Sequence, residues 1–373
     1  MAAACGGPRA TILRRLEFPN TDVVTCHAFT SDERLLATCP GTEDIAIFQV
    51  HDNDIERTHV LSKHTQQVTG LAWSSSGKLV SCSEDRTAFV WEPLSNGGWQ
   101  PILVELRAPR AALCVAWSPN GTRFAVGLSS RDVAVCYFEE KVHCWVAKKV
   151  GKSKAAVTAL AWHPTSNYLA TGSTDRRCIV YDVNEEQMLQ GGSPFGDVQV
   201  TEDAGAWVNA VAFSPKGQFL AFLAHDSRIR IKDLTGGPTA AADVVRWRGL
   251  PFSAGAFVGE RCFVAAGFDC FPVLFRQSAG RWELYGALDA GVELSSTPSD
   301  RQKGAASRQS FNEARSRFRG STGQSGKEKD GVLATWHDNT ITTCGLLNSG
   351  TNGAVRFSTS GLDGLVLVCE LSP

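Results

Sequence analysis

The sequence lacks an excess of one charge and a long apolar run, and we expect no secretory leader. Lys and Arg number 37 against 38 Asp and Glu, giving a net charge of -1, so the chain as a whole is not a basic binder of nucleic acid or membrane surfaces. No uncharged apolar run approaches the roughly 18 residues of a membrane-spanning helix. Residues 1–10 have no apolar core of the kind that secretory signals carry. We therefore expect a cytoplasmic protein that does not insert into membranes.

Closely spaced metal ligands are also missing. The 12 cysteines are spread along the chain without a Cys-x-x-Cys motif, and most lie inside apolar runs. This distribution is typical of small buried residues with reduced thiols. The nearest candidate ligands, His143 and Cys144, are adjacent in sequence and cannot share a face. The sequence therefore predicts no metal site.

Catalytic motifs are absent as well. There is no Gly-x-Ser-x-Gly, His-Glu-x-x-His or calcium-loop pattern. The tripeptide Gly151-Lys152-Ser153 ends like a phosphate loop, but Val146 stands where that loop needs its first glycine. We therefore expect no enzymatic activity and no cofactor.

The chain does contain strong internal similarity. Four segments, starting at Val68, Leu113, Val157 and Val208, share a short apolar strand that ends in an aromatic residue before a turn. With two weaker copies, the aromatic anchors step by 44, 44, 45, 51 and 44 positions through Phe29, Trp73, Trp117, Trp162, Phe213 and Phe257. This period of about 40–45 residues is that of WD repeats, so it overrides the two domains that a length of 373 residues would suggest.

A second landmark recurs in register with the first. Five aspartates each precede the last residue of a strand by six positions: Asp85, Asp175, Asp226, Asp269 and Asp363. Strand, turn, strand, Asp-centred turn and strand make up one blade of a β-propeller. We therefore predict an all-β fold, a single seven-bladed propeller domain over residues 1–373. The predicted blades lie at 24–50, 64–92, 108–138, 155–183, 206–234, 252–276 and 336–370.

The ring should be closed by the N-terminal segment. Thr11-Ile12-Leu13 is a short apolar stretch that fits no blade of its own. We expect it to supply the outer strand of the last blade, which would hide the exposed sheet edges.

Four residues of the second blade match the structural tetrad of WD repeats: His64, Ser81, Asp85 and Trp91. In such a tetrad the turn Asp accepts a hydrogen bond from the His, and the Ser hydroxyl meets both the imidazole and the indole N–H. A Ser, a His and an Asp could also form a catalytic triad. The same Asp recurs in four other blades without the His, which favours the structural role.

Two interruptions of the blade pattern stand out. Residues 289–335 form an insertion of 47 positions between blades six and seven, longer than an ordinary connection. Within 299–330, eight Lys or Arg accompany four Asp or Glu, a local charge of +4 (8 − 4). The insertion is rich in Ser and Gly, so we expect it to be disordered in the isolated protein. The second interruption, residues 184–206, is predicted to be a surface loop.

A short helix is predicted inside the insertion, over residues 310–318. Phe311, Ala314, Arg315 and Phe318 have the spacing of one helix face. This helix could pack onto its own propeller, or it could fill a partner's hydrophobic groove while its arginines face an acidic surface. Aromatic residues at helical spacing do not make the stacking platform that nucleic acid needs, so no nucleic-acid partner is expected.

Four parts of the sequence carry a resemblance to one WD-repeat family. They are residues 110–115 continuing through 123–127 to 136–139, residues 265–275, residues 194–196 with the strand at 207–208, and residues 314–318. On these segments the chain resembles the WD-repeat subunit (subunit 1, the 40-kilodalton class) of the actin-related protein 2/3 complex. The similarity runs over nearly the whole chain in the same blade order.

The resemblance implies a non-enzymatic scaffold in an actin nucleator. Such a complex binds the side of an actin filament and starts a daughter branch once nucleation-promoting factors activate it. The implied partners are the other subunits of the complex, actin filaments and nucleation-promoting factors, and the implied location is the actin cytoskeleton. In this family a protruding helix contacts actin or the activator. Phe318, Arg315 and Arg317 match its motif, whereas Phe311 rests on spacing alone.

A second interpretation of the same fold remains open. A generic WD-repeat adaptor, such as a substrate receptor of a ubiquitin ligase, would hold a peptide on its top face. Its function would survive loss of the 310–318 helix, whereas a nucleator subunit would be crippled by that loss while its propeller stayed folded.

Overall fold

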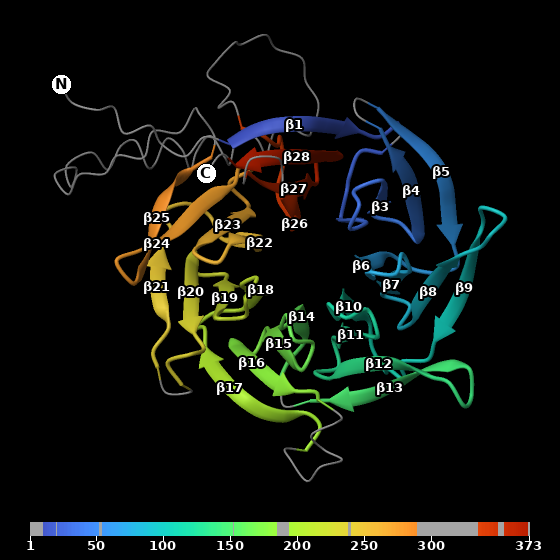
Figure 1. Cartoon of the computed structure of the whole chain (residues 1–373), viewed down its shortest axis with the longest axis horizontal. Coiled ribbons are helices and arrows are strands. Elements are labelled where there is room, and N and C mark those ends of the chain that lie inside the picture. Colours follow the sequence, from blue (N-terminus) through green and yellow to red (C-terminus); the bar gives the residue numbers. More distant parts are fainter. Residues whose placement is uncertain are drawn as a thin grey trace, which may run out of the picture.

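The computed structural model describes residues 10–19, 21–51, 54–151, 153–184, 194–237, 240–288, 335–349 and 354–371. The 28 strands of these residues form seven four-stranded antiparallel sheets, which are arranged as blades around one axis (Figure 1). The predicted all-β fold with seven blades is therefore confirmed. Of the predicted insertion only Thr335 is described. The predicted helix, with Phe311, Arg315, Arg317 and Phe318, lies outside the described residues.

Blades 1 to 6 are each built from four strands that follow one another in the chain, with the first strand innermost, whereas blade 7 combines the last three described strands with the first (Figure 1). Blade 1 has β2 (Cys26–Phe29), β3 (Leu35–Cys39), β4 (Asp44–Val50) and β5 (Ile55–Ser62). Blade 2 has β6 (Val68–Trp73), β7 (Leu79–Ser83), β8 (Ala88–Pro93) and β9 (Trp99–Val104). Blade 3 has β10 (Ala112–Trp117), β11 (Arg123–Leu128), β12 (Val133–Glu139) and β13 (Cys144–Val150).

The remaining blades repeat this order. Blade 4 has β14 (Val157–Trp162), β15 (Tyr168–Ser173), β16 (Arg177–Asp182) and β17 (Asp197–Asp203). Blade 5 has β18 (Val208–Phe213), β19 (Phe219–Ala224), β20 (Arg228–Asp233) and β21 (Asp243–Arg246). Blade 6 has β22 (Phe252–Gly259), β23 (Cys262–Gly267), β24 (Val273–Ser278) and β25 (Arg281–Ala287). Blade 7 has β26 (Ile341–Ser349), β27 (Val355–Gly361), β28 (Leu365–Leu371) and β1 (Ala10–Glu17).

Blade 7 is closed by the two ends of the chain. β1 pairs antiparallel with β28, from Ala10 opposite Leu371 to Glu17 opposite Leu365. Figure 1 shows β1 along the outside of the blade that contains β26, β27 and β28. The N-terminal segment thus supplies the outer strand of the last blade, as the sequence predicts.

The outer strands of the blades are the part of the fold that the sequence pattern predicts least well. The second strand of a blade is covered on both faces, and β19 is buried at all six positions. The outer strand β17 has the sequence DVQVTED, and its residues alternate between exposed and partly buried. The prediction of a surface loop over 184–206 is therefore wrong for residues 197–203. A strand that buries only half of one face needs few apolar residues, so its polar composition hides it.

Apolar clusters fill the interfaces between neighbouring blades. The largest include the one between blades 2 and 3, with fourteen buried residues, among them Trp117, Phe124 and Trp145. The smallest lies between blades 7 and 1, where seven buried residues such as Leu16, Phe18 and Val366 meet. Counted over the described residues, the seam that closes the ring therefore has the fewest buried residues in its apolar cluster, seven against eight between blades 6 and 7.

Candidate functional site

The residues predicted as a tetrad come together in blade 2. His64 Nδ1 lies 2.9 Å from Asp85 Oδ2, and His64 Nε2 lies 2.8 Å from Ser81 Oγ. The indole Nε1–H of Trp91 donates to the same Ser81 hydroxyl at 2.9 Å. Ser81 is 0% exposed, so a substrate could not reach it as a nucleophile. The four side chains satisfy one another's hydrogen-bonding groups and tie β7, β8 and the turn between them to the loop before the blade.

The ionisation of this network fits a structural role. Burial lowers the pKa of His64, and the bond to Asp85 offsets only part of that shift. Burial raises the pKa of Asp85, but hydrogen bonds from Thr87 and the Thr65 backbone outweigh it, so the net pKa is lowered. A neutral imidazole beside an ionised carboxylate therefore holds the turn in place around neutral pH.

The other turn aspartates hold their loops with different donors. Asp175 accepts from the backbone N–H of Lys154 at 2.7 Å and of Arg177 at 3.0 Å. Asp226 accepts hydrogen bonds from both terminal nitrogens of the Arg230 guanidinium, at 3.2 and 2.7 Å. Asp269 accepts the indole N–H of Trp247, but burial still raises its pKa.

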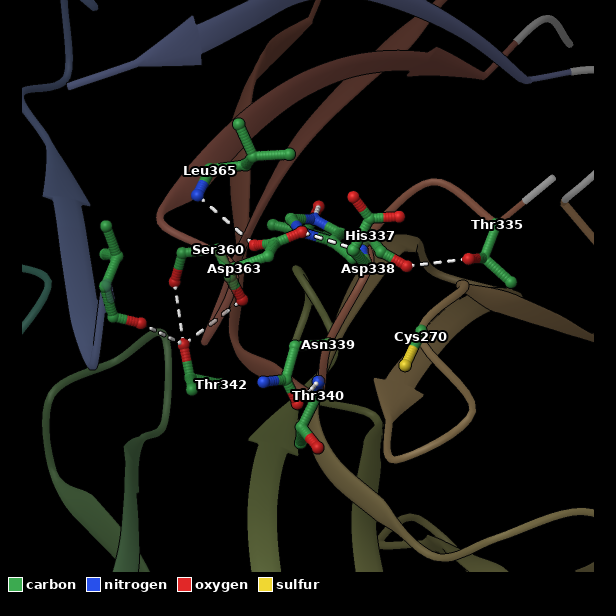
Figure 2. Close-up of polar contacts among 12 residues, drawn as sticks. Cys270, Thr335, His337, Asp338, Asn339, Thr340, Thr342, Ser360, Asp363 and Leu365 are labelled. Atoms are coloured by element: carbon green, nitrogen blue, oxygen red, sulfur yellow. Dashed lines mark hydrogen bonds and ion pairs between the residues drawn. The ribbon is translucent and has the colours of Figure 1, made fainter. Parts of the chain in front are cut away.

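Blade 7 overturns part of the sequence interpretation. His337 Nδ1 lies 3.0 Å from Asp363 Oδ2, and its Nε2 lies 2.9 Å from Thr359 Oγ1, so a histidine does accompany this turn aspartate. Figure 2 shows His337 against Asp363, which also accepts the backbone N–H of Leu365. Histidine and aspartate are 26 residues apart here and 21 apart in blade 2, so a search at fixed spacing misses the pair.

A set of bonds between blades was not predicted. In six blades, a side chain near the start of the innermost strand donates to a backbone carbonyl of the next blade's first strand or of the residue that leads into it. These bonds run from Thr69 to Ala112, Cys114 to Val157, Thr158 to Val208, Asn209 to Phe252, Ser253 to Ile341 and Thr342 to Val24. We call them the inter-blade bonds. Figure 2 shows the Thr342 hydroxyl of blade 7, which also contacts Ser360 at 2.9 Å.

The inter-blade bonds have a weak signal in the sequence. Five of the six donors stand four positions before the aromatic anchor or its equivalent, as Thr69 stands before Trp73. At these positions the pairing register between the first two strands of the blade shifts. The resulting β-bulge leaves the donor residue unpaired with the second strand and directs its side chain towards the next blade. Blade 3 has Leu113 there, and the neighbouring Cys114 thiol takes over the role.

Three arginines occupy one position in the turn between the second and third strands of blades 2, 3 and 4. Arg86, Arg131 and Arg176 have φ angles of 72°, 82° and 72°, and all three are exposed. Blade 7 has Gly364 at this position, with φ of 77°. Left-handed backbone costs a non-glycine residue about 1–2 kcal/mol. These residues, which we call the arginine arc, lie on one face of the ring because equivalent turns of a propeller share a face.

A pair of residues resembling a nucleophile and its base occurs at the seam. Ser358 Oγ lies 2.8 Å from His27 Nε2, but the other ring nitrogen faces the Thr343 hydroxyl instead of a carboxylate. Burial first, and repulsion from His337 second, lower the pKa of His27 to about 3. An imidazole with so low a pKa is a poor base near neutral pH.

The part of the chain that the structure describes contains no sign of a metal site, a disulfide or a membrane-spanning helix. No group of three His, Cys, Asp or Glu side chains within these ranges could hold a metal ion. The eleven described cysteines are all free thiols. Among the described residues no helix is long and apolar enough to cross a bilayer.

Comparison with known proteins agrees with the geometry. The family model described as WD domain, G-beta repeat, matches residues 55–92, 146–182 and 198–233. Each match starts within the outer strand of one blade and ends within the third strand of the following blade, as residues 55–92 run from β5 to β8. The sequence repeat is thus offset by one strand from the structural blade, which is why an N-terminal strand has to complete blade 7.

Full-length relatives are more specific. The chain is 37% identical to actin-related protein 2/3 complex subunit 1B of Arabidopsis thaliana, over 93% of this chain and 94% of the relative. It is 32% identical to subunit 1 of the same complex from Schizosaccharomyces pombe, over 92% and 96%. Subunit 1A-B of Xenopus laevis is 31% identical, over 93% and 94%. The chain therefore belongs to the family of subunit 1 of the actin-related protein 2/3 complex.

Proposed function

We propose that this chain is the non-enzymatic propeller scaffold of an actin-related protein 2/3 complex, a single domain that holds neighbouring subunits of a cytoskeletal assembly. The observation that carries the proposal is the similarity to subunit 1 proteins of plants, yeasts and frog over about nine-tenths of the chain. The closed ring with its inter-blade bonds supports it, because a scaffold must keep its surfaces in fixed relative positions.

Actin filaments and nucleation-promoting factors are the proposed further partners, and the insertion is the proposed surface for them. Residues 289–335 interrupt the ring between blades 6 and 7, beside the connection that carries His337. Phe318, Arg315 and Arg317, with Phe311, would present an apolar and basic face to a groove with an acidic rim.

The proposed role of the insertion is testable in the assembled complex. The double variant Phe318→Ala/Arg317→Ala removes the aromatic anchor and one cation, whereas Arg301→Ala/Lys303→Ala removes two cations of the same insertion outside 310–318. We expect both variants to co-purify with the other subunits. Only the first should lower the rate of branch formation seen by fluorescence microscopy, by about tenfold or more, as for loss of a buried aromatic contact.

A generic adaptor is the second candidate, and the arginine arc is the observation that favours it. Three exposed arginines on one face suit an acidic peptide. Under that interpretation Arg131→Glu would abolish partner capture, while Phe318→Ala/Arg317→Ala would leave the partner set and its function unchanged. Mass spectrometry of the captured proteins separates the two candidates, since actin-related proteins belong to the first and ubiquitin-ligase components to the second.

A further inference from the structure

The seam between blades 7 and 1 differs from the other interfaces in chemistry as well as size. Its apolar cluster has seven buried residues, against fourteen between blades 2 and 3. The inner part of the seam is filled by polar side chains: His27 from β2, Thr342 and Thr343 from β26, and Ser358 and Ser360 from β27. Closure of the ring therefore depends on these groups satisfying one another.

His27 is the centre of this polar seam. It is 8% exposed, and its two ring nitrogens contact the hydroxyls of Ser358 and Thr343. Thr343 in turn meets Ser360 at 2.7 Å. A neutral imidazole can donate to one hydroxyl and accept from the other, so this arrangement satisfies the neutral ring completely. A protonated ring would have two donors and no acceptor, and one of the two bonds would have to reverse.

Among the residues that the structure describes, no carboxylate forms an ion pair with His27, whose ring nitrogens contact the hydroxyls of Ser358 and Thr343. His337 of blade 7, whose imidazole contacts the Asp363 carboxylate at 3.0 Å, disfavours a positive charge on His27. Glu33 lines the same cleft, but its carboxylate is already paired with Arg356 at 3.0 Å. The Cys344 thiol of β26 stays neutral, because burial raises its pKa to about 12. The cleft, of about 290 Å³ and lined by His27, Ser358 and Leu346 among others, gives water a route to the imidazole.

We propose that the seam is an acid-sensitive latch: a proton taken up by His27 separates β2 from β26 and β27 while the other six interfaces stay closed. His27 is a positioning residue here, because it holds the two blades together through the hydroxyls of Ser358 and Thr343. The latch goes beyond the proposed scaffold function, since it would make the ring's closure, and with it the position of blade 7, respond to pH.

The expected size of the effect follows from linkage. The pKa of His27 is about 3 in the closed seam and would return to its ordinary value of 6.5 once the seam opens to water. A folded-state value below the unfolded one means that closure is fully stable above pH 6.5 and weakens as pH falls towards 3. Between pH 7.5 and pH 5.0 the opening constant should rise about 30-fold.

Amide hydrogen exchange of the full chain at pH 7.5 and 5.0, corrected for the intrinsic rate, tests the latch. We expect protection in β2, β26 and β27 to fall about 30-fold at pH 5.0, while protection in β10–β12 of blade 3 stays constant. His27→Gln, which cannot titrate, should abolish the pH dependence. His225→Gln, at an exposed histidine of blade 5, should keep it. Unchanged protection of the seam in the wild-type protein, or an equal loss in all blades, would overturn the proposal.

A second variant keeps the test decisive if His27→Gln fails to fold. Ser358→Asp places a carboxylate where the hydroxyl now meets the imidazole, so the His27 pKa in the closed seam should rise above 6.5. The sign of the pH dependence should then reverse, with the seam better protected at pH 5.0 than at pH 7.5. A dependence of unchanged sign would show that another group controls the seam, and the latch would be rejected.

Discussion

Removing one inter-blade bond should destabilise the ring by a measurable amount. The hydroxyl of Thr158 in blade 4 donates to the Val208 carbonyl of blade 5 at 2.6 Å, and the Gly172 carbonyl of its own blade lies 3.3 Å away. Thr158→Val keeps the shape of the side chain and removes the donor. The variant loses a hydrogen bond worth about 1 kcal/mol and leaves a carbonyl underpaired in a buried interface, so we expect a cost of about 1–2 kcal/mol.

The interface has little room to compensate for the lost bond. A Cβ atom added at Gly172 would lie 2.5 Å from Val208 Cγ1, so the facing strands of blades 4 and 5 are already in close contact. Water could therefore enter only if the blades moved apart. The control is Thr158→Ser, which keeps the hydroxyl and loses one methyl group, and it should cost less than half as much as Thr158→Val.

Urea unfolding followed by fluorescence measures both variants. The midpoint should fall for Thr158→Val with an unchanged slope, because the surface exposed on unfolding stays the same. Equal stability of Thr158→Val and the wild-type protein would refute the view that these bonds stabilise the ring. So would an equal loss in Thr158→Ser, since that variant retains the bond.

Two further changes test the remaining parts of the scaffold. Ser81→Ala should lower the free energy of unfolding by about 2–3 kcal/mol, because it leaves the buried indole N–H of Trp91 and one nitrogen of His64 without a hydrogen-bond partner. Ser95→Ala, in an exposed hairpin, is the control. Equal urea midpoints for the two variants would contradict a stabilising role of the Ser81 hydroxyl. Deletion of residues 10–17 removes β1 and exposes the edge of β28, so the protein should form larger species on size-exclusion chromatography, whereas a stable monomer would show that closure by β1 is dispensable.

The ring could be predicted from the sequence because its inner strands combine two patterns: a run of apolar or small residues and a regular spacing of aromatic anchors. Strands such as β7 and β19 are buried on both faces and consist of apolar or small residues, and the aromatic anchors fix their period. The outer strands carry only a weak alternation, as β17 does, so six of them fell outside the predicted blade boundaries. β1 was the exception, because an apolar stretch before the first blade had no other place in the ring.

The polar contacts were predicted less well, because they depend on loop geometry and not on period. The pair of His337 and Asp363 was missed because the hairpin of β26 and β27 is longer than that of β6 and β7, which widens the spacing between histidine and aspartate. The inter-blade bonds were missed because Thr, Asn and Ser share one role at one position, and Cys114 takes that role at the neighbouring position in blade 3, so no single residue type reveals them. His27 gave no signal at all, because its partners are more than 300 residues away in sequence.

Native mass spectrometry of the chain purified under mild conditions from its own cells tests the central claim most directly. We predict that the 40.1-kDa chain appears as one copy in a larger assembly that contains two actin-related proteins and further small subunits. Recovery of the chain alone, or with ubiquitin-ligase components in place of actin-related proteins, would contradict the proposal that this propeller is the scaffold of an actin nucleator.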